Sequence, residues 1–208
     1  MLDLHTALTF FAVALALGFT PGPDNLAVLM QSATQGRRAG VFITLGLCGG
    51  LVVHTVAVAL GLAAVFAASA TAFAVLKWVG ASYLAYIGWR TLGAPTGELS
   101  AGQPSHASAR NMFVRGMLMN LTNPKVVFFF LALLPQFVQP ARGAVALQIC
   151  ALGLIFMLTT LISFGAITWF AATLSAGLRQ SAKARQVLNY CAGTLFLALA
   201  ARLALADR

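Results

Sequence analysis

Acidic residues are scarce in this chain: Asp and Glu together number 4 among 208 residues, against 13 Lys and Arg. Charged residues of both signs make up only 8% of the chain, whereas about a quarter is usual in a soluble domain. This shortage excludes an ordinary soluble domain. The hydrophobic share of 60% and the recurring long apolar runs predict an all-α, polytopic membrane protein, with residues 1–208 forming one transmembrane domain. The basic residues lie scattered at segment ends and form no stripe, which argues against a nucleic-acid partner.

Motifs that carry chemistry are also missing. Cys48, Cys150 and Cys191 lie in separate apolar segments without metal-ligand spacing, so we expect neither a disulfide framework nor a metal site and interpret them as small packing residues. The chain has no His-Glu-x-x-His, no Gly-x-Ser-x-Gly and no phosphate-binding glycine loop. We therefore expect no enzymatic activity and no cofactor. Residues 1–5 lack the Lys or Arg of a secretory signal, which favours a retained first helix.

The most unusual feature that is present is a polar stretch, Thr20 to Asn25, inside an apolar run. Pro21, Gly22 and Pro23 cannot continue an α-helix, because proline lacks a donor and clashes with the preceding turn. Asp24 lies in this gap, and a carboxylate at the bilayer centre costs about 2.5–3.5 kcal/mol on insertion scales. One interpretation is a surface loop between two short helices. The other, which we favour, is a broken membrane helix that carries an ionisable group, as in many transporters.

The chain contains six apolar segments. Their predicted ranges are 6–33 (broken at 21–24), 40–67, 72–92, 111–138, 144–174 and 187–205. The fourth segment is broken at Asn123-Pro124-Lys125. Residues 93–110 are rich in Gly, Pro, Ser and Ala, which is typical of a flexible linker. In the second segment, Gly46 and Gly50 form a small-xxx-small pair that permits close helix approach.

The two halves of the chain, residues 1–92 and 111–208, resemble each other. Pro23-Asp24 in the first segment corresponds to Pro124-Lys125 in the fourth, and each break precedes an apolar stretch and a basic turn. Three spans per half is an odd number, so the second half would enter the membrane with inverted orientation. Helix breaks at corresponding positions of inverted repeats point to a transport site. Chance agreement between two alanine-rich halves is the other interpretation.

The distribution of basic residues predicts the orientation. One side of the predicted membrane domain carries Arg37, Arg38, Arg90, Arg110, Arg115, Arg179, Lys183 and Arg185, and the other carries Lys77, Arg142, Arg202 and Arg208. By the positive-inside rule the richer side is cytoplasmic, which places the linker in the cytoplasm and both termini outside.

Several stretches of this sequence resemble the LysE/RhtB family of lysine and homoserine/threonine exporters. The matching stretches are Thr20 to Asn25, Gly36 to Gly40, Gly46 with Gly50, Leu76 to Leu84, Asn120 to Lys125 and Leu134 to Phe137. The resemblance covers nearly the whole chain. It implies an inner-membrane carrier that exports amino acids or their derivatives and is driven by the proton gradient. The Pro-Gly-Pro-Asp form is similar to the homoserine/threonine branch.

Asp24 is the one acidic residue within an apolar segment, so it is our first candidate for binding the substrate ammonium, the coupling proton, or both in turn. A cap on the half-helix that follows is the structural alternative. Lys125 could neutralise Asp24 or hold the substrate carboxylate; a lysine that snorkels to the interface is the alternative.

Neutral polar residues flank both breaks: Asn25, Asn120, Thr122 and Asn123. They could contact substrate, but satisfying backbone groups freed by proline is the safer interpretation. His54 is a lower-ranked candidate for a proton relay. The simpler interpretation is that it is a buried histidine that hydrogen-bonds to a neighbouring helix.

The function that the sequence favours is a secondary, proton-coupled exporter of neutral amino acids related to homoserine and threonine. Its expected partners are the amino acid, the proton and the lipid bilayer, with a homo-oligomer as an open option. An ion or metal-ion transporter of the same fold is the alternative, although a lone intramembrane Asp coordinates a divalent cation poorly.

Overall fold

The computed structural model describes residues 2–20, 22–68, 108–171, 173 and 181–205, together with 78, 81–82, 85–86, 89–90 and 92–93. Within these residues all regular secondary structure is helical, as predicted. Most of the third predicted segment and most of the linker lie outside the described residues.

The first predicted segment is two helices, α1 (Leu4–Phe19) and α2 (Pro23–Gln35), bent by 60°. Asp3 caps the start of α1, because its carboxylate accepts a hydrogen bond from the Thr6 backbone N–H at 2.8 Å. Thr20 is in an extended conformation and ends the helix. Proline then occupies the first turn of α2, where its missing donor costs nothing. The predicted break is therefore confirmed, although Pro21 itself lies outside the described residues.

The fourth predicted segment is also broken, with a bend of 56°. It begins with α5 (Ala109–Thr122) and continues after Asn123 as α6 (Pro124–Phe128). Three short irregular helices follow: a π-helix η1 (Phe129–Leu133) and two 3₁₀ helices, η2 (Leu134–Phe137) and η3 (Pro140–Arg142). No local pattern in the sequence predicts the π-helix.

Two long helices complete the centre of the molecule, α3 (Arg37–Ala68) and α7 (Val145–Trp169). Residues Arg37–Gly61 and Val145–Trp169 are each apolar and long enough to cross a membrane, and the two bent pairs raise the number of candidate spans to four. The last helix, α9 (Ala182–Leu205), covers the sixth predicted segment. The arrangement of six spans in two inverted repeats thus stays a prediction.

Some predicted boundaries are wrong. The chain leaves the helical conformation at Phe170, so α7 ends before the predicted residue 174. Helix α9 begins at Ala182, before the predicted residue 187, because polar residues such as Lys183 extend a helix beyond its apolar run. Cys150 and Cys191 are exposed on helix surfaces, so they are not packing residues as we expected.

Glycine sets the closest helix crossing. A Cβ atom on Gly46 of α3 would lie 2.1 Å from the Phe113 carbonyl oxygen of α5, and one on Gly116 of α5 would lie 2.3 Å from the Ile43 carbonyl oxygen of α3. Gly50 meets the Asn120 side chain in the same way. The backbones of α3 and α5 therefore touch, which confirms the role predicted for Gly46 and Gly50.

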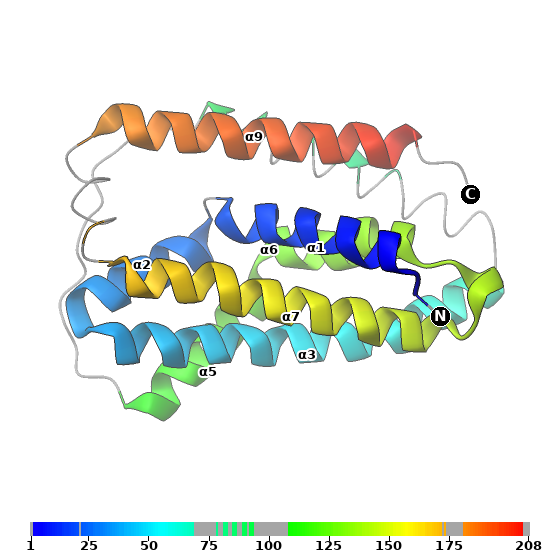
Figure 1. The fold of residues 1–208 in the computed structure, drawn as a ribbon, viewed down its shortest axis with the longest axis horizontal. Coiled ribbons are helices and arrows are strands. Elements are labelled where there is room, and N and C mark those ends of the chain that lie inside the picture. The colour runs from blue at the N-terminus through cyan, green and yellow to red at the C-terminus, as the bar shows by residue number, and fades with distance from the viewer. Residues whose placement is uncertain are drawn as a thin grey trace.

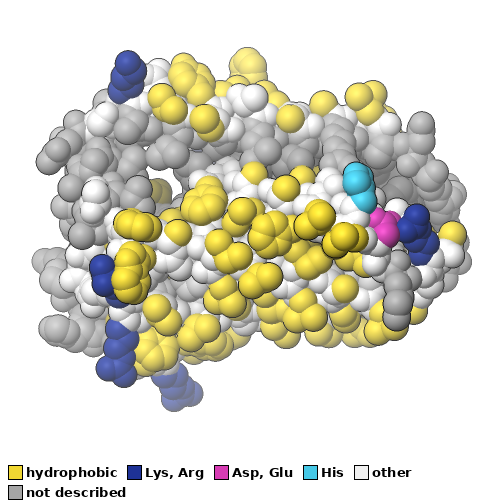
Figure 2. Space-filling model, in the orientation of Figure 1, with side chains coloured by type: hydrophobic (Ala, Val, Ile, Leu, Met, Phe, Trp, Pro, Cys, Tyr) yellow, Lys and Arg dark blue, Asp and Glu magenta, His cyan; other side chains and the backbone are white. Residues whose placement is uncertain are grey.

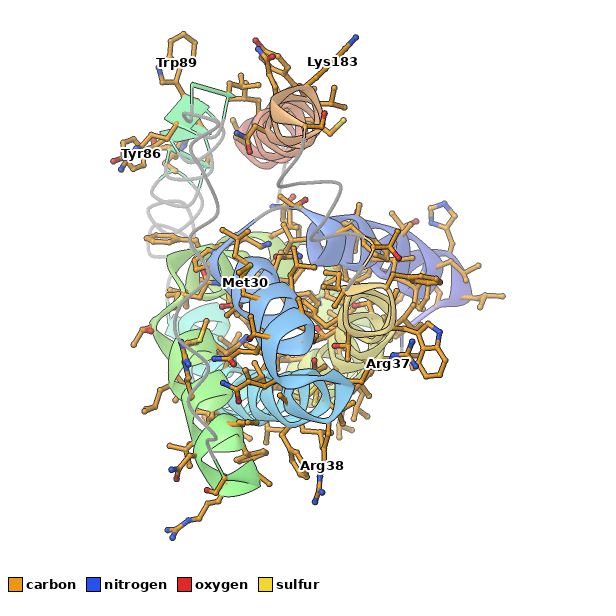
Figure 3. All side chains as sticks on the ribbon, turned by 90° about the vertical axis from the view of Figure 1, so that its left-hand side faces the viewer. Met30, Arg37, Arg38, Tyr86, Trp89 and Lys183 are labelled. Carbon is orange, nitrogen blue, oxygen red and sulfur yellow. The ribbon has the colours of Figure 1, made fainter. Side chains whose placement is uncertain are left out.

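Figure 1 shows that the helices run roughly along one axis and that α1 begins at the same end of the molecule as α9 ends. The turn between α2 and α3, the start of α5 and the end of α7 lie at the opposite end. Gly36 makes the α2–α3 turn with φ at +84°, a conformation that favours glycine. Arg37, Arg38 and Lys183 gather at this second end, which we call the basic end (Figure 3).

On the face that Figure 2 shows, the described surface between the two ends is largely hydrophobic. Most of the basic side chains visible there lie at the edge that holds the basic end, and one lies beside an acidic side chain at the other edge. At the basic end, the Arg37 guanidinium lies 4.0 Å from the centre of the Trp169 ring. A cation over an aromatic ring at the end of a span is typical of the membrane–water interface.

Candidate functional site

The two helix breaks meet in the middle of the molecule, and Lys125 joins them. Its side chain is only 9% exposed. The ammonium crosses from the second break to the first, where it donates hydrogen bonds to the carbonyl oxygens of Leu17 (3.1 Å) and Thr20 (2.9 Å). These carbonyls form the negative end of the α1 dipole, which favours a cation. Lys125 thus caps α1 from 105 residues or more away along the chain.

Asn25 and Thr20 complete the end of α1. The Asn25 amide donates to the Gly18 carbonyl oxygen at 2.7 Å, and the Thr20 hydroxyl donates to the Ala16 carbonyl oxygen at 2.9 Å. The Thr20 backbone N–H already reaches the Ala16 and Leu17 carbonyls, so Asn25 and Lys125 supply donors to the Gly18 and Thr20 carbonyls beyond this last backbone bond of α1. Such compensation is what allows irregular backbone at membrane depth.

Gly22 makes room for the ammonium. A Cβ atom at this position would lie 3.4 Å from the Lys125 nitrogen and 3.7 Å from Asn25 Oδ1. The second break has its own cap in Asn123, whose side-chain oxygen accepts from the Lys125 backbone N–H at 3.0 Å. Pro124 follows at the first position of α6, where proline is well tolerated.

Asp24 lies in the first turn of α2 and is only 4% exposed. Gly22 occupies the N-cap position, so no side chain caps α2 there. The Lys125 ammonium and the Asn123 side chain of the second break lie close enough to act electrostatically on the Asp24 carboxylate, while Asp24 Oδ1 and Asn123 Nδ2 make no hydrogen bond among the described residues. Asp24 and Lys125 thus occupy matching positions. Each lies at the start of one half-helix and interacts with groups of the other break.

Several buried polar atoms at the breaks lack a hydrogen bond of ordinary geometry to the described residues. They are Asp24 Oδ1, Asn25 Oδ1, Asn120 Oδ1 and Asn123 Nδ2. An unpaired buried polar group costs about 1–3 kcal/mol, so a packed protein rarely keeps several together. Three acceptors and one donor at the breaks are therefore buried without a partner among the described residues.

The remaining predicted residues lie around this centre. His54 of α3 stacks on Phe130 with ring centres 5.4 Å apart, and its Nε2 lies 3.4 Å from the Asn120 carbonyl oxygen. Thr122 is exposed and its hydroxyl donates to the Leu118 carbonyl oxygen of its own helix. Pro23 begins α2 and is exposed.

Sequence reasoning missed two further groups of residues. One is a set of buried rings beyond the breaks, Phe10, Phe129, Phe130, Phe137 and Phe156. The other is a pair of glutamines on α2, Gln31 and Gln35, each with a buried and unpartnered side-chain oxygen. Their spacing of seven and eleven residues from Asp24, which places all three on one helix face, was the signal that could have found the pair.

Among the described residues, no group of three or more His, Cys, Asp or Glu side chains is placed to hold a metal ion. A helical membrane protein with two broken helices that cross at a buried carboxylate and a buried ammonium has the architecture of a secondary transporter. The family comparison agrees: residues 15–207 match the model of the LysE type translocators, and the chain belongs to this family.

Similar proteins support the same assignment. A homoserine/homoserine lactone efflux protein of Salmonella typhimurium is 34% identical over 191 residues, which cover 90% of each chain. A membrane protein of Vibrio cholerae is 31% identical over 203 residues, 94% of this chain and 95% of the relative. A membrane protein of Bacillus subtilis is 29% identical over 178 residues, 80% of each chain. No solved structure matches this chain.

Proposed function

We propose that this translocator is a proton-coupled exporter of neutral amino acids such as homoserine. The observation that carries the proposal is the meeting of the two breaks, where Asp24 and Asn25 keep unpartnered acceptor oxygens close to the Lys125 ammonium. A zwitterion needs an opposite charge or an aimed dipole for each of its ends in a low-dielectric site. This site offers both.

The substrate ammonium fits the acceptors. An ammonium group has three N–H donors, and Asp24 Oδ1 and Asn25 Oδ1 are free to accept from it. The substrate carboxylate fits Lys125 and the unpartnered Asn123 amide of the second break. The Salmonella relative is named for both homoserine and its lactone, which share the amino group but not the carboxylate. Recognition centred on the ammonium accounts for a carrier that accepts both.

Asp24 is also the group that we assign to the proton. When the Asp24 carboxylate takes up a proton, it loses its negative charge and can release the substrate ammonium. Export of the amino acid is thereby coupled to entry of the proton. Asp24→Asn keeps the shape of the side chain and removes the titratable charge. This variant should insert and fold, and should lose transport driven by a pH gradient; gradient-independent exchange survives if Asp24 binds the proton alone.

We further propose two inverted repeats in the inner membrane, with the basic end in the cytoplasm by the positive-inside rule. Helix α1 packs on α7 and helix α5 packs on α3, so the first part of each broken helix lies against the long helix of the other half, whereas α2 contacts both long helices. This exchange is what a two-fold axis within the membrane plane produces.

The deciding experiment is counterflow of labelled amino acids in proteoliposomes that contain the purified protein. We expect homoserine to exchange strongly and lysine weakly, with the Asp24→Asn variant deficient in pH-driven flux. Wild-type pH-driven flux in Asp24→Asn would remove Asp24 from the coupling, and the absence of any amino-acid exchange in wild-type liposomes would overturn the substrate class.

A further inference from the structure

Helix α2 carries a second row of polar groups that the site at the breaks does not use. Gln31 and Gln35 both have side-chain oxygens that are buried and lack a partner among the described residues. At 100° per residue, positions 24, 31 and 35 lie within about 40° of one another around the helix axis. Asp24 Oδ1 is itself unpartnered, so three buried acceptor oxygens follow one face of α2.

This row extends from the break to the end of the helix. Residues 24 to 35 span about 16 Å of helix axis, and the turn at Gly36 and the basic Arg37 follow at once. Figure 3 looks at the molecule from the basic end and shows α2 between α5 and α7. Helix α2 contacts both of them, as well as α3.

On the neighbouring face of α2, the polar side chain has hydrogen-bond partners. Ser32, one position on from Gln31, donates to the Val28 carbonyl oxygen at 2.6 Å and lies 3.5 Å from the Thr168 hydroxyl of α7. Gly40 of α3 packs against the same Ser32 hydroxyl. That side is satisfied by tight packing. At 100° per residue, the exposed residues Leu26 and Ala33 lie on the side of α2 opposite the unpartnered row, so the row faces the interior of the molecule.

The half of the molecule beyond the breaks has the opposite character. The ring of Phe10 packs on Phe137 with centres 5.0 Å apart, and Phe129 stacks on Phe156 with centres 4.5 Å apart. All four rings are buried, and they close the space between α1, η1, η2 and α7. Polar acceptors without partners thus continue from the breaks toward the basic end, whereas aromatic packing seals the other direction.

We propose that the face of α2 formed by Asp24, Gln31 and Gln35 lines the half of the substrate pathway between the paired breaks and the basic end of the molecule. This half is closed in the present structure, where the three oxygens are buried, and it fills with water when it opens during transport. Carbonyl oxygens spaced one to two helical turns apart accept hydrogen bonds from water and from the ammonium group of a passing zwitterion. Irregular or polar groups at membrane depth are tolerated where they line such a cavity. The identity of the solute that travels along this face rests on the proposed function, whereas the access of water to the face does not.

Thiol accessibility tests the proposal directly. In a background with Cys48, Cys150 and Cys191 replaced by serine, single variants Gln31→Cys and Gln35→Cys are treated with an anionic, membrane-impermeant methanethiosulfonate in sealed vesicles of each orientation. The matched control is Ala33→Cys, which lies on the exposed face of the same helix. Only a thiolate in contact with water reacts quickly with such a reagent.

We expect Gln31→Cys and Gln35→Cys to react at least tenfold faster than Ala33→Cys, and only from the side that carries the basic end. Equal rates for all three variants, or faster reaction from the opposite side, would overturn the inference. As a second measurement, Gln31→Leu and Gln35→Leu should each reduce exchange at least tenfold while Ala33→Leu does not; unchanged exchange in both glutamine variants also counts against the pathway. Fast labelling without any amino-acid exchange would leave the pathway standing and refute the proposed substrate.

Discussion

Removal of the Lys125 charge is the perturbation that best tests how the two breaks hold each other. In Lys125→Met the side chain keeps its approximate length, but the Leu17 and Thr20 carbonyl oxygens lose their donor. Polar bonds between helices in a bilayer contribute about 0.6–1.7 kcal/mol each, so the two bonds together account for about 1–3 kcal/mol. The buried Asp24 carboxylate also loses the attraction of the nearby ammonium, and leaving a buried charge without compensation costs about 3–5 kcal/mol.

We therefore expect Lys125→Met to lower the free energy of unfolding by about 4–8 kcal/mol, the two contributions together. The measurement is denaturation of the purified protein in mixed detergent micelles, followed by loss of helical signal. Lys183→Met is the matched control, because Lys183 is exposed at the start of α9, and it should leave the free energy of unfolding unchanged.

A double-mutant cycle separates the two contributions. Adding Asp24→Asn to Lys125→Met removes the uncompensated carboxylate, so the double variant should recover stability and differ from wild type by only the about 1–3 kcal/mol of the two carbonyl bonds. The reasoning is refuted if Lys125→Met is as stable as Lys183→Met. It is also refuted if the effects of the two substitutions simply add.

Three further predictions concern packing, pH and topology. Gly46→Ala should cost about 1–3 kcal/mol of stability because its methyl group would lie 2.1 Å from the Phe113 carbonyl oxygen, whereas Gly165→Ala, with nothing within 4 Å, should be neutral in the same denaturation assay; equal stabilities would contradict the close crossing of α3 and α5. The hydrogen bond from the Thr6 backbone holds the pKa of Asp3 below its ordinary 3.8, so the stabilisation by Asp3 is complete above that value and is lost as the pH falls through the lowered pKa. Wild type should thus melt at a higher temperature than Asp3→Ala at neutral pH and at the same temperature in strong acid, and a gap that persists in acid would count against this account. Reporter fusions should place the 93–110 linker in the cytoplasm and both termini outside, and termini on opposite sides of the membrane would exclude the six-span arrangement.

Much of the fold was predictable because its signals are local. Apolar runs mark α3 and α7, and the prolines at 23 and 124 begin new half-helices wherever the rest of the chain lies. Helix ends were predicted less well, as the early end of α7 shows. The π-helix at Phe129–Leu133 depends on how buried rings pack against α1 and α7, and no local pattern announced it.

The candidate site was likewise predictable from the sequence only in part. The sequence by itself determined that Asp24 is the acidic residue embedded in an apolar run and that a lysine follows the second break, since composition and proline chemistry depend on neighbours in the chain. Only the tertiary structure decided that the Lys125 ammonium reaches the carbonyls of Leu17 and Thr20, and that Gln31 and Gln35 continue the row begun by Asp24 as buried, unpartnered acceptors. A hydrogen bond across more than a hundred residues exists only when the bundle has brought the two breaks together. Whether a polar atom finds a partner is likewise fixed by what packs around it, and the order of residues does not contain that information.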